Sequence, residues 1–244
     1  MKDISNKRKI YTTDNGIIIV DSKIKTQILN ILEHESKESE IVKITGKSKS
    51  TISVHLNNLM DQGIIDYKPH PIDRRSKLFF IKAKYIGEIY NRGLLIETPT
   101  KPKNILNPLT FYKTKDELLK STFLKKGLTL DPIFEEVGTS MGKKLYNQLE
   151  IGTEDEFFKR IQELYKDLDL GSLKITKTEE RIIVKNNNCK ECVKVLEIPI
   201  STCAFNKGLL KGLMEQYYNY HIIIDEVECR SKNDDACTFL IEKE

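Results

Sequence analysis

Three cysteines and a glutamate dominate the chemistry of the C-terminal part of the chain: Cys203, Glu226, Cys229 and Cys237. Thiolate and carboxylate are zinc ligands, and four of them complete the tetrahedral set of a structural zinc site. Cys203 stands at the head of a helix predicted over 203–219, and the other ligands stand in strands predicted near 221–229 and 236–242. Converging from the head of a helix and two successive strands, the four residues would form one tetrahedral, zinc-type ligand set.

The spacing carries one geometric difficulty. Glu226 and Cys229 are three residues apart, so a regular strand would point them to opposite faces. A bulge or bend near Val227 is therefore required if both bind one ion. The alternative is a structural role without metal, in which these cysteines are small buried residues on apolar strand faces. Four protein ligands leave no open position, which favours a structural zinc over a catalytic one.

The same residues carry a family resemblance. Cys203, the run Glu226-Val227-Glu228-Cys229 and the later Cys237-Thr238-Phe239 resemble the metal-binding core of 4-vinyl reductase domains. The resemblance implies a zinc-binding sensor domain, because the family includes sensor domains of aromatic-responsive regulators. It also implies a small apolar ligand, held between helix 131–149 and a row of apolar residues at near-helical spacing: Phe205, Leu209, Leu213, Tyr217 and Tyr218. The family usually has Gly where this chain has Asn233, and Asn tolerates the left-handed conformation.

Cys189 and Cys192 form a separate CxxC motif after a polar run. The motif could be a redox dithiol, half of another metal site, or two loop cysteines. Methanogen regulators that carry a 4-vinyl reductase-like domain are similar in architecture, and the resemblance implies a redox role for this pair.

Composition limits the cellular setting. Five cysteines in 244 residues cannot all pair internally, and no apolar run is long enough to cross a bilayer. The N-terminus has no apolar signal-peptide core. We expect a cytoplasmic protein without membrane segments, and the Lys-, Ile- and Asn-rich composition is suggestive of some archaea.

The N-terminal third is predicted to be a winged helix-turn-helix. Helices fit 22–34, 37–44 and 48–62, and two extended segments follow at Ile64–Lys68 and Leu78–Lys82. Residues 1–90 hold 16 Lys and Arg against 11 Asp and Glu, so the positive excess of the chain lies here. This asymmetry is expected when one module of a protein meets phosphate and the other does not.

The third helix has a polar outer face suited to the major groove of DNA. The predicted contacts on this helix and in the following wing are Ser50, Thr51, Ser53, Val54, Asn57, Asn58, Arg74, Arg75 and Lys77. Asn can bond adenine, Ser and Thr can reach phosphate, and Val can touch a thymine methyl group. The helix resembles the recognition helix of ArsR-type repressors, and Asp73-Arg74-Arg75 is similar to the basic wing tip of the MarR group. The alternative is a winged helix used for protein contact.

Three segments are expected along the chain: a DNA-binding domain over 1–96, a proline-rich linker over 97–112, and a sensor domain over 113–244. A helix is predicted from Tyr85 to about Leu95. Helices also fit 131–149 and 154–167, and strands fit 171–177, 181–187 and 193–199. The fold class is therefore α+β, a winged helix-turn-helix followed by a mixed α/β domain of the 4-vinyl reductase type.

These observations predict a non-enzymatic, homodimeric transcriptional regulator that binds double-stranded DNA and contains zinc. The alternative is a tetrapyrrole- or small-molecule-handling protein or enzyme that uses the winged helix for assembly. The segment from Gly138 to Lys144 superficially resembles a phosphate loop, but it lies in a helical pattern and lacks Ser or Thr after the lysine. Its glycines are expected to allow close packing against a neighbouring helix.

Overall fold

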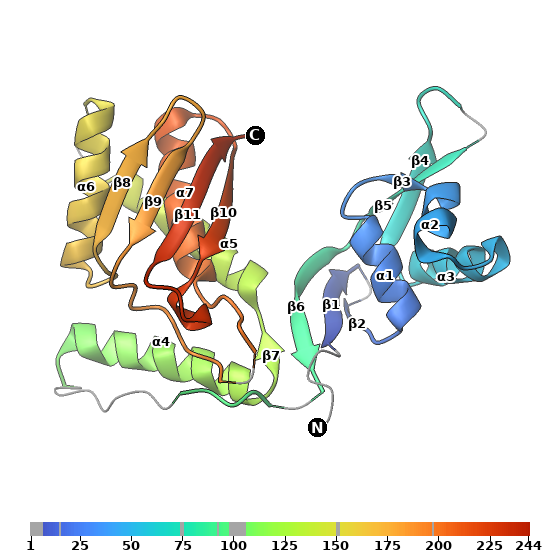
Figure 1. The fold of residues 1–244 in the computed structure, drawn as a ribbon, viewed down its shortest axis with the longest axis horizontal. Helices are drawn as coiled ribbons and strands as arrows, with labels where there is room; N and C mark the ends of the chain where they lie inside the picture. Colours follow the sequence, from blue (N-terminus) through green and yellow to red (C-terminus); the bar gives the residue numbers. More distant parts are fainter. Residues whose placement is uncertain are drawn as a thin grey trace. The chain divides into compact units, whose positions relative to one another are not determined.

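The computed structural model (Figure 1) describes residues 7–14, 16–73, 76–91, 93–97, 106–149, 152–196 and 198–244. The chain divides into two compact units, Met1–Asn91 and Arg92–Glu244. Both units combine helices with antiparallel sheets, as the α+β prediction requires. Among the described helices, none has the length and apolar character needed to span a bilayer.

The first unit is a winged helix-turn-helix with an added sheet. Its elements are β1 (Lys7–Thr13), β2 (Gly16–Val20), α1 (Lys23–Ile31), β3 (Ser36–Lys37), α2 (Glu38–Thr45), α3 (Lys49–Asp61), β4 (Ile65–Pro69), β5 (Lys77–Ile81) and β6 (Lys84–Tyr90). Strands β4 and β5 form the antiparallel wing, and β3 pairs with the other edge of β5. Strand β1 pairs with both β2 and β6.

Local sequence signals explain the helix boundaries of this unit. The Ser48 hydroxyl accepts a hydrogen bond from the backbone N–H of Thr51, which caps the N-terminus of α3. Helix α2 ends at Gly46, whose φ of 66° is left-handed. The three helices bury one continuous core, to which α3 contributes Ile52, Leu56 and Leu59.

One element of this unit differs from its prediction. The helix expected from Tyr85 to about Leu95 is instead strand β6, which pairs with β1. The isoleucines and tyrosines of this segment suit strands as well as helices, so their spacing is ambiguous. Gly87 has a φ of 154° near the point where the register with β1 shifts, which fits a bulged strand. Strands β1 and β2 are additions that the sequence pattern does not predict.

The second unit places helices against a four-stranded antiparallel sheet. Its elements are α4 (Pro108–Lys125), β7 (Leu128–Thr129), α5 (Asp131–Tyr146), α6 (Glu154–Asp167), β8 (Leu173–Lys177), β9 (Ile182–Asn186), α7 (Ala204–Tyr218), β10 (Ile222–Glu228), the 3₁₀ turn η1 (Arg230–Lys232) and β11 (Cys237–Lys243). The strand order is β10-β11-β9-β8. Helices α6 and α7 share one core with these strands. Helix α4 passes beneath the lower end of the sheet in Figure 1.

Glycines bring α5 and α7 into backbone contact. A Cβ added to Gly138 would lie 2.2 Å from the carbonyl oxygen of Phe205, and one added to Gly212 would lie 2.2 Å from that of Thr139. The expected close packing of this helix is therefore confirmed. At these positions no room remains for an apolar ligand between the two helices, which would have to move apart to admit one.

Two further segments differ from the expectation. Residues 193–199 do not form a strand: the described part contains a single β-bridge, between Val195 and Ile96. Helix α4 is not among the predicted elements, and it begins at Pro108, inside the segment expected to be a linker. Its N-terminus has clear signals, because Asn107 caps it and Pro108 occupies the first turn.

Candidate metal centre and nucleic-acid interface

The predicted ligands converge at one end of the sheet of the second unit. Cys203 is the N-cap of α7, Cys237 begins β11, and Cys229 directly precedes η1. The register between β10 and β11 shifts between Glu226 and Glu228, so the bulge required near Val227 is confirmed. Asn233 ends η1 with a φ of 76°, the left-handed conformation expected for it.

The sulfur separations match the size of a single-metal site. The Sγ atom of Cys203 lies 3.6 Å from that of Cys229 and 3.5 Å from that of Cys237. The Sγ atoms of Cys229 and Cys237 lie 3.9 Å apart. A tetrahedron with zinc–sulfur bonds of about 2.3 Å has sulfur–sulfur edges of about 3.8 Å. The three thiols are thus placed as zinc ligands would be.

Glu226 completes this set with an oxygen that lacks another partner. One carboxylate oxygen, Oε2, accepts a hydrogen bond from the Ser201 hydroxyl. The other, Oε1, is buried and has no hydrogen-bond partner among the described residues. Burial and the nearby Cys229 raise the pKa of Glu226 to about 8. A buried carboxylate oxygen without a donor is suited to a cation, so the residues fit a zinc ion.

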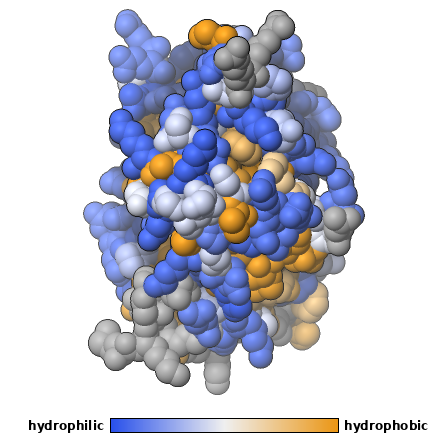
Figure 2. Space-filling view, turned by 90° about the vertical axis from the view of Figure 1, so that its right-hand side faces the viewer, coloured by the Kyte–Doolittle hydropathy of each residue, from blue (hydrophilic) through white to orange (hydrophobic). Residues whose placement is uncertain are grey.

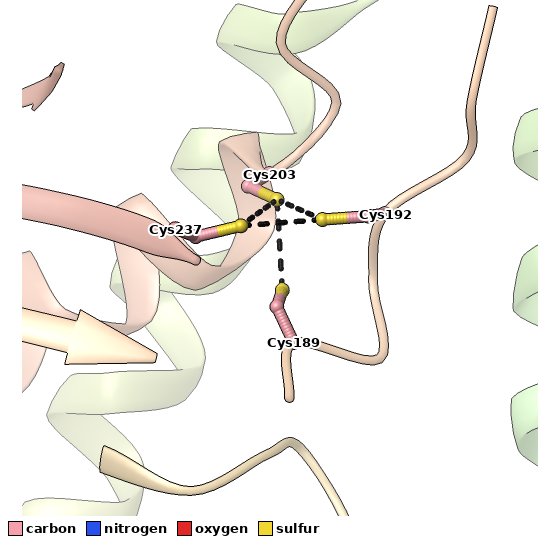
Figure 3. A group of neighbouring side chains, drawn as sticks. All are labelled: Cys189, Cys192, Cys203 and Cys237. Atoms are coloured by element: carbon pink, nitrogen blue, oxygen red, sulfur yellow. Dashed lines mark hydrogen bonds between the residues drawn. The ribbon is translucent and has the colours of Figure 1, made fainter. Parts of the chain in front are cut away.

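The CxxC motif is not separate from this site. The Sγ atom of Cys192 lies 3.1 Å from that of Cys203 and 3.2 Å from that of Cys237. The Sγ atom of Cys189 lies 3.6 Å from that of Cys203 (Figure 3). All five cysteines are free thiols, and Cys192 alone among them is partly exposed. The structure thus brings the predicted redox pair into the predicted metal site.

A buried ion pair holds the CxxC loop in place, and no sequence pattern indicates it. The Nζ atom of Lys120 on α4 lies 2.9 Å from Oε1 of Glu191, and it also donates to the carbonyl oxygen of Thr202. Glu191 accepts the backbone N–H groups of Phe205 and Asn206 at 3.0 and 2.8 Å. Glu191 therefore caps the first turn of α7 from inside the CxxC motif.

Hydrogen bonds polarise the thiols of the cluster. The Nδ2 atom of Asn206 lies 3.5 Å from Sγ of Cys189, and the Ser231 hydroxyl lies 2.9 Å from Sγ of Cys229. Hydrogen bonds from neighbouring thiols, that of Cys192 foremost, lower the pKa of Cys189 and of Cys229. Hydrogen bonds with neighbouring thiols, that of Cys189 foremost, raise the pKa of Cys192, Cys203 and Cys237. Thiolate is the form that binds metal and that reacts with oxidants.

The predicted DNA-contacting residues of the first unit lie on α3 and β5. Ser50, Asn57 and Asn58 are exposed on α3, as is Lys77 on β5. Val54 is 65% exposed, which is unusual for an apolar residue in the middle of a helix that packs on a core. Hydrophilic residues predominate on the molecular face seen in Figure 2, with hydrophobic residues in separate patches. Arg74 and Arg75 lie outside the described residues.

Four of these side chains already have hydrogen-bond partners within the protein: Ser50, Thr51, Ser53 and Asn58. The Ser53 hydroxyl donates to Glu38 on α2, and the Asn58 amide oxygen accepts from Nζ of Lys25 on α1. Thr51 is half-buried and contacts the capping Ser48 at 2.8 Å between hydroxyl oxygens. A groove of about 610 Å³ runs beside α3, and its lining includes Lys49, Ser53, Asn57 and Lys77. Ser50, Val54 and Asn57 are the side chains most open to a ligand.

Comparisons with known proteins identify both parts of the chain. Residues 22–67 match the model of the ArsR family of bacterial regulatory proteins, and residues 182–243 match the model of the 4-vinyl reductase domain. The chain therefore carries an ArsR-type helix-turn-helix and a 4-vinyl reductase domain, as the sequence predicted. This combination supports a DNA-binding regulator with a sensory domain.

Relatives occur in a methanogen. The chain is 29% identical to the uncharacterized protein MJ0745 of Methanocaldococcus jannaschii, over 68% of this chain and 82% of that protein. It is 24% identical to the uncharacterized protein MJ0150 of the same organism, over 60% of this chain and 82% of that protein.

Among solved structures, one similar chain is a vinyl-4-reductase family protein from the same organism. Its TM-score is 0.37 and its identity 18%, over 61% of this chain and 85% of that one. Another is the phenol-responsive sensory domain of the transcription activator PoxR with phenol, with a TM-score of 0.42 and 11% identity over 64% and 80% of the two chains. Neither likeness is close enough to bear on the function of this chain.

Proposed function

We propose that this protein, which joins an ArsR-type helix-turn-helix to a 4-vinyl reductase domain, is a homodimeric transcriptional regulator whose zinc-containing C-terminal domain senses redox state and modulates operator binding. The observation that carries the proposal is the meeting of all five cysteines in the domain attached to a DNA-binding module. Five free thiols at one site suit a sensor better than a purely structural site.

DNA recognition is assigned to α3 and the wing. Ser50, Val54 and Asn57 would face base edges in the major groove, and Lys77 would approach phosphate. Ser53 and Asn58 would first have to leave their partners on α2 and α1, so they contribute less. A dimer would present two such helices to paired half-sites.

Zinc is assigned to Cys203, Glu226, Cys229 and Cys237. A bound zinc ion would cross-link the start of α7 to the hairpin of β10 and β11, because its ligands come from both. The redox step is assigned to Cys189 and Cys192. A peroxide would oxidise the two thiols to a disulfide, taking their two electrons and two hydrogens to form water. A small apolar ligand has less support, because α5 and α7 are in backbone contact.

DNA binding is tested on the full-length protein with operator sequences selected from random DNA. Lys77→Ala should weaken binding to all sequences and reduce the slope of log affinity against log salt by about 1, because one phosphate contact is lost. Lys174→Ala removes the same charge from an exposed position on β8 and serves as the control. Equal slopes for the two variants would contradict the wing assignment.

The redox part is tested by comparing operator affinity in reduced protein and after mild peroxide treatment. Oxidation should change the affinity of the wild type, and Cys189→Ser should remove the change. Identical affinities of reduced and oxidised wild type would refute the redox assignment. The alternative function, tetrapyrrole handling, predicts a bound pigment with strong visible absorption and no selective operator binding.

A further inference from the structure

The cluster contains two complete four-ligand sets. One consists of Cys189, Cys192, Cys203 and Cys237, and the other of Cys203, Glu226, Cys229 and Cys237. Within each set the ligand atoms all lie within 4.8 Å of one another. Cys203 and Cys237 belong to both sets, so the two tetrahedra share an edge. We propose that the site binds two zinc ions, bridged by the thiolates of Cys203 and Cys237.

The sulfur separations support a shared edge. The bridging pair, Cys203 and Cys237, is 3.5 Å apart, and Cys192 lies 3.1 and 3.2 Å from the two bridging sulfurs. Cys229 lies 3.6 and 3.9 Å from the same two sulfurs. The separations of Cys229 and of the bridging pair are within about 0.3 Å of the edge of about 3.8 Å expected for tetrahedral zinc, and those of Cys192 are about 0.6–0.7 Å shorter.

The terminal ligands then divide without conflict. Cys189 and Cys192 complete one ion, and Glu226 and Cys229 complete the other. The buried oxygen Oε1 of Glu226, which has no hydrogen-bond partner among the described residues, receives a cation in this arrangement. Neither ion has an open position, so neither is a catalytic zinc.

Charge favours two ions over one. Fully deprotonated, the five thiols and one carboxyl of the two sets carry six negative charges, and Cys203, Cys229 and Cys237 are fully buried. One zinc ion offsets two of these charges and two zinc ions offset four. The nearby cation Lys120 is already paired with Glu191, so it does little for the thiolates. Binding would release the thiol protons to solvent.

The CxxC loop is held at the site by contacts that involve no metal. Within the motif, Glu191 is fixed to Lys120 and to the first N–H groups of α7, whose N-cap is Cys203. Such a preorganised loop places Cys189 and Cys192 at ligand distance without further ordering cost. This is an independent reason to treat these two residues as ligands in the reduced protein.

The inference rests on the zinc binding proposed above, and the metal count separates the two. Native mass spectrometry of the reduced, zinc-supplemented full-length protein should find two zinc ions per chain. One zinc per chain would overturn the dinuclear site and leave the proposed single zinc intact. No zinc, or bound iron and sulfide, would overturn both.

Variants and a spectroscopic signature test which ligands belong to which ion. The pairs Cys189→Ser/Cys192→Ser and Glu226→Gln/Cys229→Ser should each retain one zinc, whereas Lys190→Ala, an exposed change in the same loop, should retain two. In wild-type protein loaded with ¹¹³Cd, two cadmium resonances should show scalar coupling through the bridging thiolates. Two uncoupled resonances would overturn the bridge even if two ions bind, and this measurement needs no variant to fold.

Discussion

The substitution Lys120→Met tests whether the buried ion pair holds the CxxC loop. It removes the ammonium group that lies 2.9 Å from Glu191 and leaves a side chain of similar length. The carboxylate of Glu191 then stays buried beside α7 with only its two backbone N–H donors. The chain provides a matched control on the same helix: Lys113, whose Nζ atom lies 2.5 Å from Asp169 in an exposed pair.

The magnitude follows from the difference in burial. The side chains of Lys120 and Glu191 are 10% and 15% exposed, against 39% and 49% for Lys113 and Asp169. Removing one partner of a buried pair costs about 3–5 kcal/mol, whereas an exposed pair contributes about 0–1 kcal/mol. Because Glu191 keeps two hydrogen bonds, we expect a cost of about 3 kcal/mol, at the lower end of the range for buried pairs. For a domain of this size that is a fall in Tm of about 6–12 °C.

The assay is thermal unfolding followed by calorimetry, on protein prepared with zinc under reducing conditions. Lys120→Met should lower the Tm of the second unit, and Lys113→Met should leave it nearly unchanged. The double variant Lys120→Met/Glu191→Gln should cost less than the sum of its two single variants, because the two residues interact directly. The ion pair does not have the role assigned to it if Lys120→Met lowers the stability no more than Lys113→Met does. The same holds if the stability losses of Lys120→Met and Glu191→Gln simply add in the double variant.

Two further predictions concern the second unit. Gly212→Ala should destabilise this unit by about 1–3 kcal/mol in urea unfolding, because the new Cβ would lie 2.2 Å from the Thr139 carbonyl oxygen. The exposed change Ser140→Ala on α5 is the control. A Gly212→Ala protein more stable than wild type would mean that the two helices are not in contact. The hydrogen bond from Lys177, 2.6 Å from Oε2 of Glu154, lowers the pKa of Glu154 below its ordinary value of 4.5. Its stabilisation is present above that value and is lost as pH falls through the lower folded pKa. Glu154→Gln should therefore be less stable than wild type near pH 7, and the difference should shrink as pH falls through the folded pKa. A pH-independent difference would refute the reasoning.

Elements with strong local signals were predictable from the sequence. Helix α6 has the predicted bounds of 154–167, because Thr153 and Glu156 form a capping box and its apolar residues recur on one face. The turn of the helix-turn-helix is equally local, since Gly46 and Ser48 end one helix and cap the next. Strand β6 was not predictable in this way, because what decides it is pairing with β1, about 75 residues earlier in the chain.

The position of the CxxC motif depends on contacts between distant parts of the chain. Residues 187–202 contain no helix or strand among the described positions, so no periodicity reports where Cys189 and Cys192 point. Their place is set by the contact of Glu191 with Lys120, which is 71 residues away. Helix α4, which contains Lys120, has weak amphipathic character, so the apolar pattern did not indicate a helix there. Lys120 is buried, which is unusual for lysine, so its role was not predicted either. Sequence reasoning could identify the ligand types here but not how many of them meet.

The ligands at the end of β10, Glu226 in the strand and Cys229 directly after it, were predictable because their spacing does not fit a regular strand. A regular strand cannot present Glu226 and Cys229 to one ion, so the ligand spacing itself requires that the strand break register between them. The structure has the shift at that point, and Asn233 makes the left-handed turn that returns the chain toward Cys237. A regular β10 would have turned one ligand toward solvent and closed the sheet without a metal site. The metal site therefore requires this local irregularity in the strand. Functional sites are where a local sequence rule, here the alternation of side chains along a strand, is expected to be broken.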